Sequence, residues 1–541
     1  VPLRVERKLF SREKEIDHCW QALQDGQAIT LTGESGVGKT TLGSHLAHLW
    51  GQPSVFWFTI RPGFNDHIQN LAFALGYFFK TLNEPTLWQE MMTQTTAASD
   101  HLAHLIRYSL QNLHKSHIRP LLCFDEVDLL RPTQESKHTQ LIALLDNLRG
   151  QVPMLLIGQQ SLLDPQPFCI LEDLTLSATT QMLEEANIRL LPAEIQRIHS
   201  YTNGNPRLIE LVITLFAYGV SRAELFQEID IAPPLEFFLS KIALRMEPNE
   251  VALLNALAVF RNPAPVDFWQ KHSELGLALN QLLQRRLIVA DDHGGIVILA
   301  AYRNILYRLL PVEARQALHE TAAAIWTTRA AHTSAAYHLI EAGQSELAVL
   351  QWYQHRQQEI NQGQASAAYE LFHKLEPQSL SPLARQQHGL TCAELARLVG
   401  NDQQALKDIH SVVWSAPVLG INAYIQEGMI ANDAHEFTEA RHKFVQALAM
   451  AENLIEIQLA YIHKGLSWAH FSEKDLQIAW QESQRARYEV EYMQGLIQIE
   501  MASYSQAAQF LQSALLLAQA IGYKDGIAKA ANSLSVVLGM Q

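Results

Sequence analysis

The octapeptide GESGVGKT, from Gly33 to Thr40, constrains this chain more than any other segment. It fits the pattern GxxxxGK followed by Ser or Thr, and it lies between an apolar run, AITLT, and an amphipathic helical stretch, TLGSHLAHLW. In this setting glycines let backbone N–H groups wrap the α- and β-phosphates of a nucleotide, the lysine reaches the β- and γ-phosphates, and the hydroxyl is a Mg²⁺ ligand. The predicted nucleotide-binding residues are Gly33, Glu34, Ser35, Gly36, Val37, Gly38, Lys39, Thr40 and Thr41, the last placed at the start of the helix within reach of the α-phosphate.

A second motif, LLCFDEVD, runs from Leu121 to Asp128 and joins an apolar strand to adjacent acids. In a phosphate site of this kind Asp125 is expected to hold Mg²⁺, commonly through water, and Glu126 to polarise the attacking water. Asp128 either adds a second acid or caps the following helix. The sequence thus predicts ATP or ADP with Mg²⁺ as cofactors, with Lys39, Asp125 and Glu126 as catalytic residues and Thr40 and Asp125 as metal ligands.

Strand and helix patterns alternate over the first part of the chain, which we predict to be a nucleotide-binding domain over residues 1–170. Such alternation indicates a parallel sheet with helices on both faces and its ligand at the carboxyl ends of the strands. The four predicted strands are Ala28–Thr32, Ser54–Ile60, Pro120–Phe124 and Pro153–Ile157.

The strands then give way to helical patterns. Residues 171–240 are predicted to form a small helical domain that is broken at the turn-rich TNGNP, Thr202–Pro206. Residues 241–315 combine helices with a hairpin in RRLIVADDHGGIVIL, which suggests a winged helix. A helical arm over 316–380 is expected to follow.

A repeat emerges in residues 381–541. Phe437, Ala440, Phe444 and Ala447 share their spacing with Tyr504, Ala507, Leu511 and Ala514, and each set follows a glycine, Gly428 or Gly495, by nine residues. The offset is 67 residues, or two units of about 34, and a middle unit holds Gly465, Ala479 and Ala486. This pattern indicates tetratricopeptide-like repeats, in which small residues let paired helices touch; an unrelated helical bundle with coincident alanines is the alternative.

Composition excludes several classes of protein. The chain has 541 residues with a net charge of −14 and a pI near 5.9, which argues against basic surfaces for nucleic acid or anionic membranes. Its four cysteines form neither a disulfide framework nor a CxxC zinc site, and no apolar stretch reaches the roughly 18 residues of a membrane span. We therefore expect a cytoplasmic protein without membrane contact.

Both ends suggest that the chain is part of a longer protein. The first residues, VPLRVERKLF, have neither an initiator Met nor the apolar region of a signal peptide. The last segment, GYKDGIAKAANSLSVVLGMQ, looks like the first helix of a repeat without its second helix, so we expect the repeats to be incomplete.

These motifs resemble the STAND class of signal-transduction ATPases, which includes the NACHT and NB-ARC proteins and the maltose-regulator group. The whole chain follows the order of that class: nucleotide-binding domain, helical domain, winged helix and superhelical repeat sensor. The maltose-regulator group is nearest, because AYHLIEAGQSELAVLQWY (Ala336–Tyr353) is similar to its helical repeat after the winged helix. The resemblance implies that Arg12, in FSREKEI, lies near the adenine, where the alternative is a solvated N-terminal helix. It also implies that Pro206 of Gly204-Asn205-Pro206 contacts the adenine.

Two departures from this class concern phosphate recognition. Many relatives place a γ-phosphate-sensing arginine after the fourth strand, where this chain has Gln159, which can donate a hydrogen bond but carries no charge. The class also uses a winged-helix histidine on the β-phosphate of ADP, and Ala300 or Ala301 stands there, with Arg303 nearby. We expect this change to weaken an ADP-held closed state.

The resemblance implies a nucleotide-driven switch with slow ATPase activity through Glu126. A trigger, protein or small molecule, would bind the C-terminal repeats, and the ATP form would self-associate and activate an effector outside this chain, in bacterial immunity or regulation. One alternative is a nucleotide-independent tetratricopeptide scaffold, against which the intact Gly38-Lys39-Thr40 and Asp125-Glu126 speak. Another is a winged-helix transcription regulator of the maltose-regulator type, although residues 270–300 contain no basic stripe for direct nucleic-acid binding.

Overall fold

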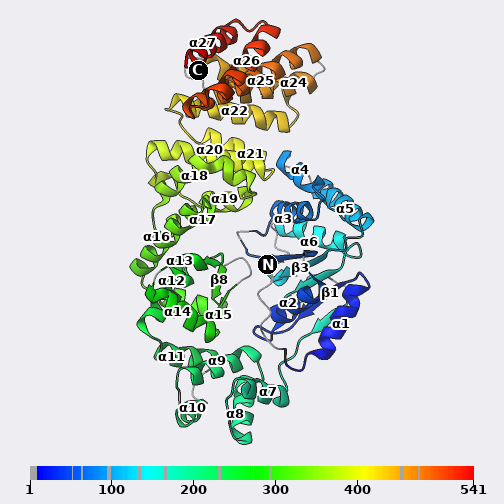
Figure 1. Cartoon of the computed structure of the whole chain (residues 1–541), viewed down its shortest axis with the longest axis vertical. Coiled ribbons are helices and arrows are strands. Elements are labelled where there is room, and N and C mark those ends of the chain that lie inside the picture. The colour runs from blue at the N-terminus through cyan, green and yellow to red at the C-terminus, as the bar shows by residue number, and fades with distance from the viewer. Residues whose placement is uncertain are drawn as a thin grey trace. The chain divides into compact units, whose positions relative to one another are not determined.

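The computed structural model (Figure 1) describes residues 9–51, 53–62, 65–93, 99–130, 136–163, 167–229, 233–271, 273–290, 295–298, 300–450, 456–472 and 475–540. The chain divides into two units, residues 1–348 with 355–367 and residues 349–354 with 368–541. Each unit has hydrophobic clusters of its own. None of the described helices has the length and apolar character that a membrane span requires.

The first unit begins with a five-stranded parallel sheet. Its strands are β1 (Ala28–Thr32), β2 (Val55–Thr59), β3 (Leu121–Asp125), β4 (Met154–Ile157) and β5 (Phe168–Ile170), in the spatial order β2-β3-β4-β1-β5. The four predicted strands are confirmed. The fifth was missed because β5 is a three-residue edge strand in which only Cys169 is buried, too short to show a pattern.

Helices cover both faces of this sheet, as predicted. One face is packed by residues of α1 and α2, including Leu23 and Leu42, and the other by residues of α3, α5 and α6, including Leu75, Ile106 and Leu144. The helices are α1 (Glu13–Gln24), α2 (Lys39–Trp50), α3 (Ile68–Thr81), α4 (Thr86–Thr93), α5 (Ser99–Lys115) and α6 (Ser136–Leu148), with a 3₁₀ helix η1 (Val127–Leu129). Strands buried on both faces explain why β1, β3 and β4 read as apolar runs without alternation.

Five helices follow the sheet. They are α7 (Leu176–Glu185), α8 (Pro192–Thr202), α9 (Pro206–Ala217), α10 (Arg222–Glu228) and α11 (Pro234–Ala243). The predicted break at TNGNP is confirmed: Asn203 ends α8 with a left-handed φ of 52°, and the Asn205 side chain accepts hydrogen bonds from the backbone of Arg207 and Leu208 to cap α9. Pro206 occupies the first turn of α9, where no backbone N–H is needed.

The winged helix contains a three-stranded antiparallel sheet in the order β6-β8-β7. Its elements are α12 (Pro248–Ala258), β6 (Ala264–Pro265), α13 (Val266–Gln270), α14 (Ser273–Gln284), β7 (Ile288–Ala290), β8 (Gly295–Ile298) and α15 (Ala300–Leu309). The predicted hairpin is confirmed, and the two-residue β6 was not foreseen. One continuous cluster joins this core to the preceding helices, and the predicted boundaries at 240 and 315 fall within α11 and α16. The domain limits therefore stay a prediction.

The rest of the described chain is helical. Its helices are α16 (Val312–Thr328), α17 (His332–Glu341), α18 (Ser345–Asn361), α19 (Ala365–Phe372), α20 (Pro382–Leu398), α21 (Asp402–His410), α22 (Pro417–Asp433), α23 (Phe437–Ala449), α24 (Glu456–Ser472), α25 (Leu476–Glu500), α26 (Tyr504–Ala520) and α27 (Lys524–Met540), with a 3₁₀ helix η2 (Pro377–Ser379). From α22 onward each helix packs against the next. The repeated alanines Ala440, Ala447, Ala507 and Ala514 are fully buried, as the repeat pattern requires.

One helix departs from the expected repeat. The repeat pattern pairs two helices in each unit, which implies separate helices for Ala479 and for Gly495 where α25 runs. The structure has a single helix of 25 residues. Its first half packs on α24, where Ser467 Oγ donates to Ala479 O at 2.8 Å, and its second half packs Tyr488 and Tyr492 against α26 and α27. The sequence contains no Gly, Pro or Asn between residues 479 and 494 that would break the helix.

The repeated glycines make room for Phe444, and this packing can be tested. We expect Gly465→Ala to lower the melting temperature, because its Cβ would lie 2.2 Å from Phe444 Cζ; a Cβ at Gly428 would likewise lie 2.7 Å from that ring atom. Gly539→Ala in α27 is the control, since nothing lies within 4 Å of its Cβ position. Helix propensity favours Ala by about 1 kcal/mol in a helix interior such as that of Gly465, and by less at Gly539, next to the last residue of α27. A lower melting temperature for Gly465→Ala than for Gly539→Ala therefore reflects the overpacking cost of about 1–3 kcal/mol. Equal melting temperatures in calorimetry would contradict this packing.

Candidate functional site

The loop between β1 and α2 carries the first motif. Its glycines Gly33, Gly36 and Gly38 have φ values of 147°, 84° and 101°, which side chains rarely adopt. A Cβ at Gly36 would lie only 2.8 Å from Asn205 Oδ1, so the loop packs closely against the start of α9. Asn205 Nδ2 also donates to Ser35 O at 3.1 Å. The same asparagine therefore caps α9 and holds the loop.

Lys39 begins α2 and turns back over the loop. Its Nζ donates to Gly33 O and Glu34 O, both at 2.8 Å. Burial lowers the pKa of Lys39, and the carboxylates of Glu126, Asp128 and Asp125 oppose that shift. The structure thus places this ammonium between the loop and the acidic motif. A nucleotide phosphate bound by the loop would contact it there.

The acidic pair lies at the carboxyl end of β3, beside the first turn of α2. Thr40 Oγ1 lies 3.3 and 3.2 Å from the two carboxylate oxygens of Asp125. Burial, followed by the charge of Glu126, raises the pKa of Asp125 to about 7. Burial and Asp128 also raise the pKa of Glu126, whose backbone is left-handed with φ 60°. A cation would relieve this crowding of buried carboxylates.

Hydroxyl and carboxylate oxygens are the ligands that Mg²⁺ prefers, so Thr40 and Asp125 fit that ion. In the described chain, no group of three or more His, Cys, Asp or Glu side chains is placed to hold a metal. Mg²⁺ here would therefore depend on nucleotide phosphates as further ligands, as is common for this ion.

Gln159 lies between the two motifs because β4 is inserted between β1 and β3. Its side chain is exposed and lines the same cavity as Lys39 and Glu126. Asp128 Oδ1 accepts a hydrogen bond from Gln159 N at 3.0 Å, and it would lie 2.6 Å from a Cβ at Gly158. Asp128 thus positions the loop after β4, and its charge also acts on Glu126 and Lys39, as the predicted role of a second acid implies.

Arg12 is buried, with 6% of its surface exposed, which excludes the alternative of a solvated N-terminal segment. Its guanidinium donates to Glu172 O at 2.5 Å and to Val37 O at 3.5 Å, and it pairs with Glu15 at 3.2 Å. Arg12 therefore joins the phosphate loop to the segment after β5. Its contact with adenine stays a prediction.

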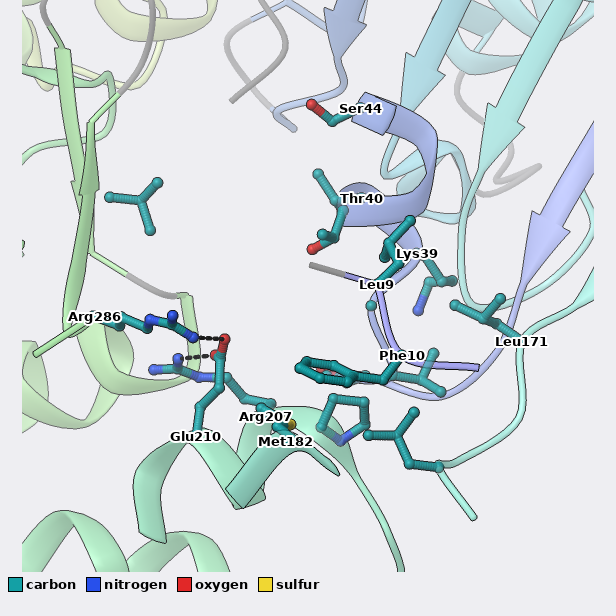
Figure 2. A pocket seen from close by; sticks show the side chains of 18 of the residues that line it. Leu9, Phe10, Lys39, Thr40, Ser44, Leu171, Met182, Arg207, Glu210 and Arg286 are labelled. Atoms are coloured by element: carbon teal, nitrogen blue, oxygen red, sulfur yellow. Dashed lines mark hydrogen bonds and ion pairs between the residues drawn. The ribbon is translucent and has the colours of Figure 1, made fainter. Parts of the chain in front are cut away.

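A cavity of about 550 Å³ brings these residues together. The loop from Ser35 to Thr41, with Asp125, Glu126 and Gln159, forms its polar side. Leu9, Phe10, Leu171, Met182 and Pro206 supply apolar lining, and Figure 2 shows Phe10 pointing toward Met182. An adenine ring needs such apolar surface, and its phosphates need the loop, so the cavity fits a nucleotide of this kind.

Several lining residues were missed by sequence reasoning. Arg207 and Glu210 of α9 and Arg286 before β7 line the wall of the cavity. Arg207 directly follows the Pro206 that was singled out. No local pattern in the sequence indicates that Arg286 lies near Glu210. The winged-helix positions Ala300 and Ala301 begin α15, and their side chains lie outside the described part. Arg303 Nε donates to Ala258 O at 3.1 Å within the winged helix and does not line the cavity.

Comparisons with known proteins bear on the family and the fold. A family model described as an AAA domain matches residues 22–164. A solved structure of a STAND protein with a tetratricopeptide repeat sensor, PH0952 from Pyrococcus horikoshii, covers 100% of this chain and 81% of its own, at 14% identity and a TM-score of 0.65. The Walker-type ATPase PABY2304 of Pyrococcus abyssi covers 57% of this chain and 99% of its own, at 15% identity and a TM-score of 0.31. No curated protein matches the sequence significantly.

The likeness to PH0952 extends over the whole chain and shows the fold. The resemblance to a STAND protein with tetratricopeptide-like repeats is thereby confirmed, as is the predicted fold class of a parallel-sheet P-loop domain with helical domain, winged helix and α-solenoid.

Proposed function

We propose that this chain is an ATP- and ADP-binding switch. The observation that carries the proposal is the shared cavity: Lys39 of the phosphate loop, Arg207 of the helical domain and Arg286 of the winged helix line one space. A nucleotide bound there would contact all three parts. Its phosphates can then favour one arrangement of these parts over another. Such a shift requires that ATP and ADP bind the two arrangements with different affinities.

Each predicted residue has a role in this proposal. The loop from Gly33 to Gly38 binds phosphates through its N–H groups, and Lys39 neutralises their charge. Mg²⁺, when bound beside Thr40 and Asp125, supplies further neutralisation of the phosphates. Glu126 orients and deprotonates the attacking water for a slow ATPase step, and Gln159 donates a hydrogen bond to the terminal phosphate. Arg12 and Pro206 border the adenine.

The repeats of the second unit complete the proposed switch. They bind a trigger, protein or small molecule, and the ATP form self-associates and activates an effector, in bacterial immunity or regulation. The AAA-domain match and the fold of PH0952 support a nucleotide-dependent switch in general. The four cysteines are buried and unpaired, which is consistent with the reducing cytoplasm as its location.

The test is to denature the purified chain and identify the released nucleotide by ion-exchange chromatography. Near-stoichiometric ADP or ATP is expected, because the cavity combines a charged loop with apolar lining. Sedimentation of the native chain with ATP and Mg²⁺ is expected to show a larger species than with ADP. If nothing is released and added ATP with Mg²⁺ does not bind, the switch is ruled out and the tetratricopeptide scaffold takes its place.

A further inference from the structure

The cavity wall that faces the phosphate loop carries a concentration of charge. Arg207 and Glu210 come from α9, and Arg286 comes from the turn between α14 and β7. Figure 2 shows both guanidinium groups directed at the carboxylate of Glu210. Arg207 lies 2.9 Å from one of its oxygens and Arg286 lies 3.9 Å from the other. Glu210 is therefore a contact between the helical domain and the winged helix.

Two adjacent arginines behave differently here. Arg285 pairs with the fully buried Glu250 and stacks 4.0 Å over the ring of Tyr218, and its carbonyl accepts from Thr214 Oγ1 at 3.0 Å. These contacts fix Arg285 in the structure. Arg286 is 51% exposed, and its distance to Glu210 is too long for a hydrogen bond.

Such an ion pair contributes little. A half-exposed pair without a hydrogen bond is worth well under about 1 kcal/mol, so it can be exchanged for another anion at small cost. Arg286 also has a left-handed backbone with φ 59°, which is unusual for a long side chain and places it at the turn before β7. Arg286 lines the same cavity as Lys39 and Thr40.

We propose that Arg286 binds the terminal phosphates of the nucleotide, and that Glu210 competes with those phosphates for its guanidinium. This inference rests on the proposed function, since it assigns one further residue to the same site. A phosphate draws Arg286 from Glu210 and ties the winged helix to the nucleotide instead of to α9. The winged-helix contact with phosphate that the STAND resemblance implies near Ala300 or Ala301 is thus supplied by Arg286, from another part of the same domain.

The test measures binding of ATP, ADP and adenosine to the full chain and to Arg286→Gln. Charge-assisted hydrogen bonds are stronger than neutral ones, so ATP and ADP affinities are expected to fall about tenfold, whereas adenosine affinity stays unchanged. Arg222→Gln is the matched control: Arg222 is 47% exposed and pairs with Glu194, and it does not line the cavity. Glu210→Gln is expected to tighten ATP and ADP, and to do so less in the presence of Arg286→Gln.

The outcomes separate this inference from the proposed function. If Arg286→Gln binds all three ligands as the unchanged chain does, Arg286 is no phosphate ligand and the inference is overturned. If it loses adenosine as strongly as ADP, its role is structural and the inference is overturned as well. If the unchanged chain binds no nucleotide, the proposed function itself fails. Arg286→Lys, which keeps the charge, is expected to retain part of the ADP affinity, and its failure to exceed Arg286→Gln would also count against the inference.

Discussion

Lys39→Met is expected to abolish measurable ATP and ADP binding at micromolar nucleotide. The change keeps the apolar stem of the side chain and removes the ammonium that lies over Gly33 and Glu34. Hydrogen bonds to a charged group contribute about 1.5–3 kcal/mol each, so losing two to phosphate oxygens costs about 3–6 kcal/mol and lowers affinity on the order of 100-fold to 10,000-fold. Titration calorimetry with ADP and with ATP and Mg²⁺ measures the effect.

Loss of binding has to be distinguished from loss of folding. The two carbonyls that Lys39 contacts lie in a partly exposed loop, where water can replace the ammonium, so we expect the melting temperature to change little. Lys271→Met removes the same charge from an exposed position of the winged helix and should leave both binding and melting unchanged. Nucleotide binding by Lys39→Met at the affinity of the unchanged chain would refute the phosphate site.

Glu126→Gln is expected to retain ATP binding and to lose ATP hydrolysis. Glutamine has the same shape, but it cannot accept the proton of the attacking water. Loss of a general base costs roughly 100-fold to 10,000-fold in rate. The elevated pKa of Glu126, caused first by burial and then by Asp128, fits a carboxylate that takes up a proton. Release of phosphate in single turnover measures the rate.

A second measurement is the identity of the nucleotide that stays bound to Glu126→Gln. If hydrolysis is blocked while binding persists, the nucleotide released from denatured Glu126→Gln should be ATP, and self-association should increase relative to the unchanged chain. Glu13→Gln, an exposed change in the first turn of α1, serves as the control. If Glu126→Gln hydrolyses ATP at the rate of the unchanged chain, Glu126 is not the general base and its carboxylate has no catalytic role.

Local sequence signals were sufficient for most of the fold. The apolar runs at β1 and β3 do not alternate with polar residues, because both faces of the sheet are covered. Their apolar composition is therefore enough to predict these strands. The β5 strand could not be predicted, since Phe168 and Ile170 are exposed and pairing with β1 alone defines it. The boundaries at 240 and 315 were placed from the change in strand and helix patterns. One hydrophobic cluster, which extends to Ala322 and Ile325, crosses both of them, and α11 and α16 run through them.

The site likewise contains residues that the sequence predicts and residues that only the fold brings together. The loop from Gly33 to Thr40 is contiguous, so its arrangement follows from its own sequence. Glu210 and Arg286 meet only because the shared core of the helical domain and the winged helix brings α9 and the turn before β7 together. Nothing near Arg286 in the sequence indicates that contact. The nucleotide contacts themselves stay predictions that the variants above would test.

The continuous helix α25 has a mechanical consequence for the repeats. A turn between two repeats acts as a joint, and small rotations at successive joints let a solenoid flex. Here the joint is replaced by 25 residues of uninterrupted helix, about 37 Å long at 1.5 Å per residue. The helices packed on its two halves must therefore tilt together, because both pack on one rigid helix. A ligand that displaces α24 would move α26 and α27 by the same rotation, with little of the displacement lost to bending.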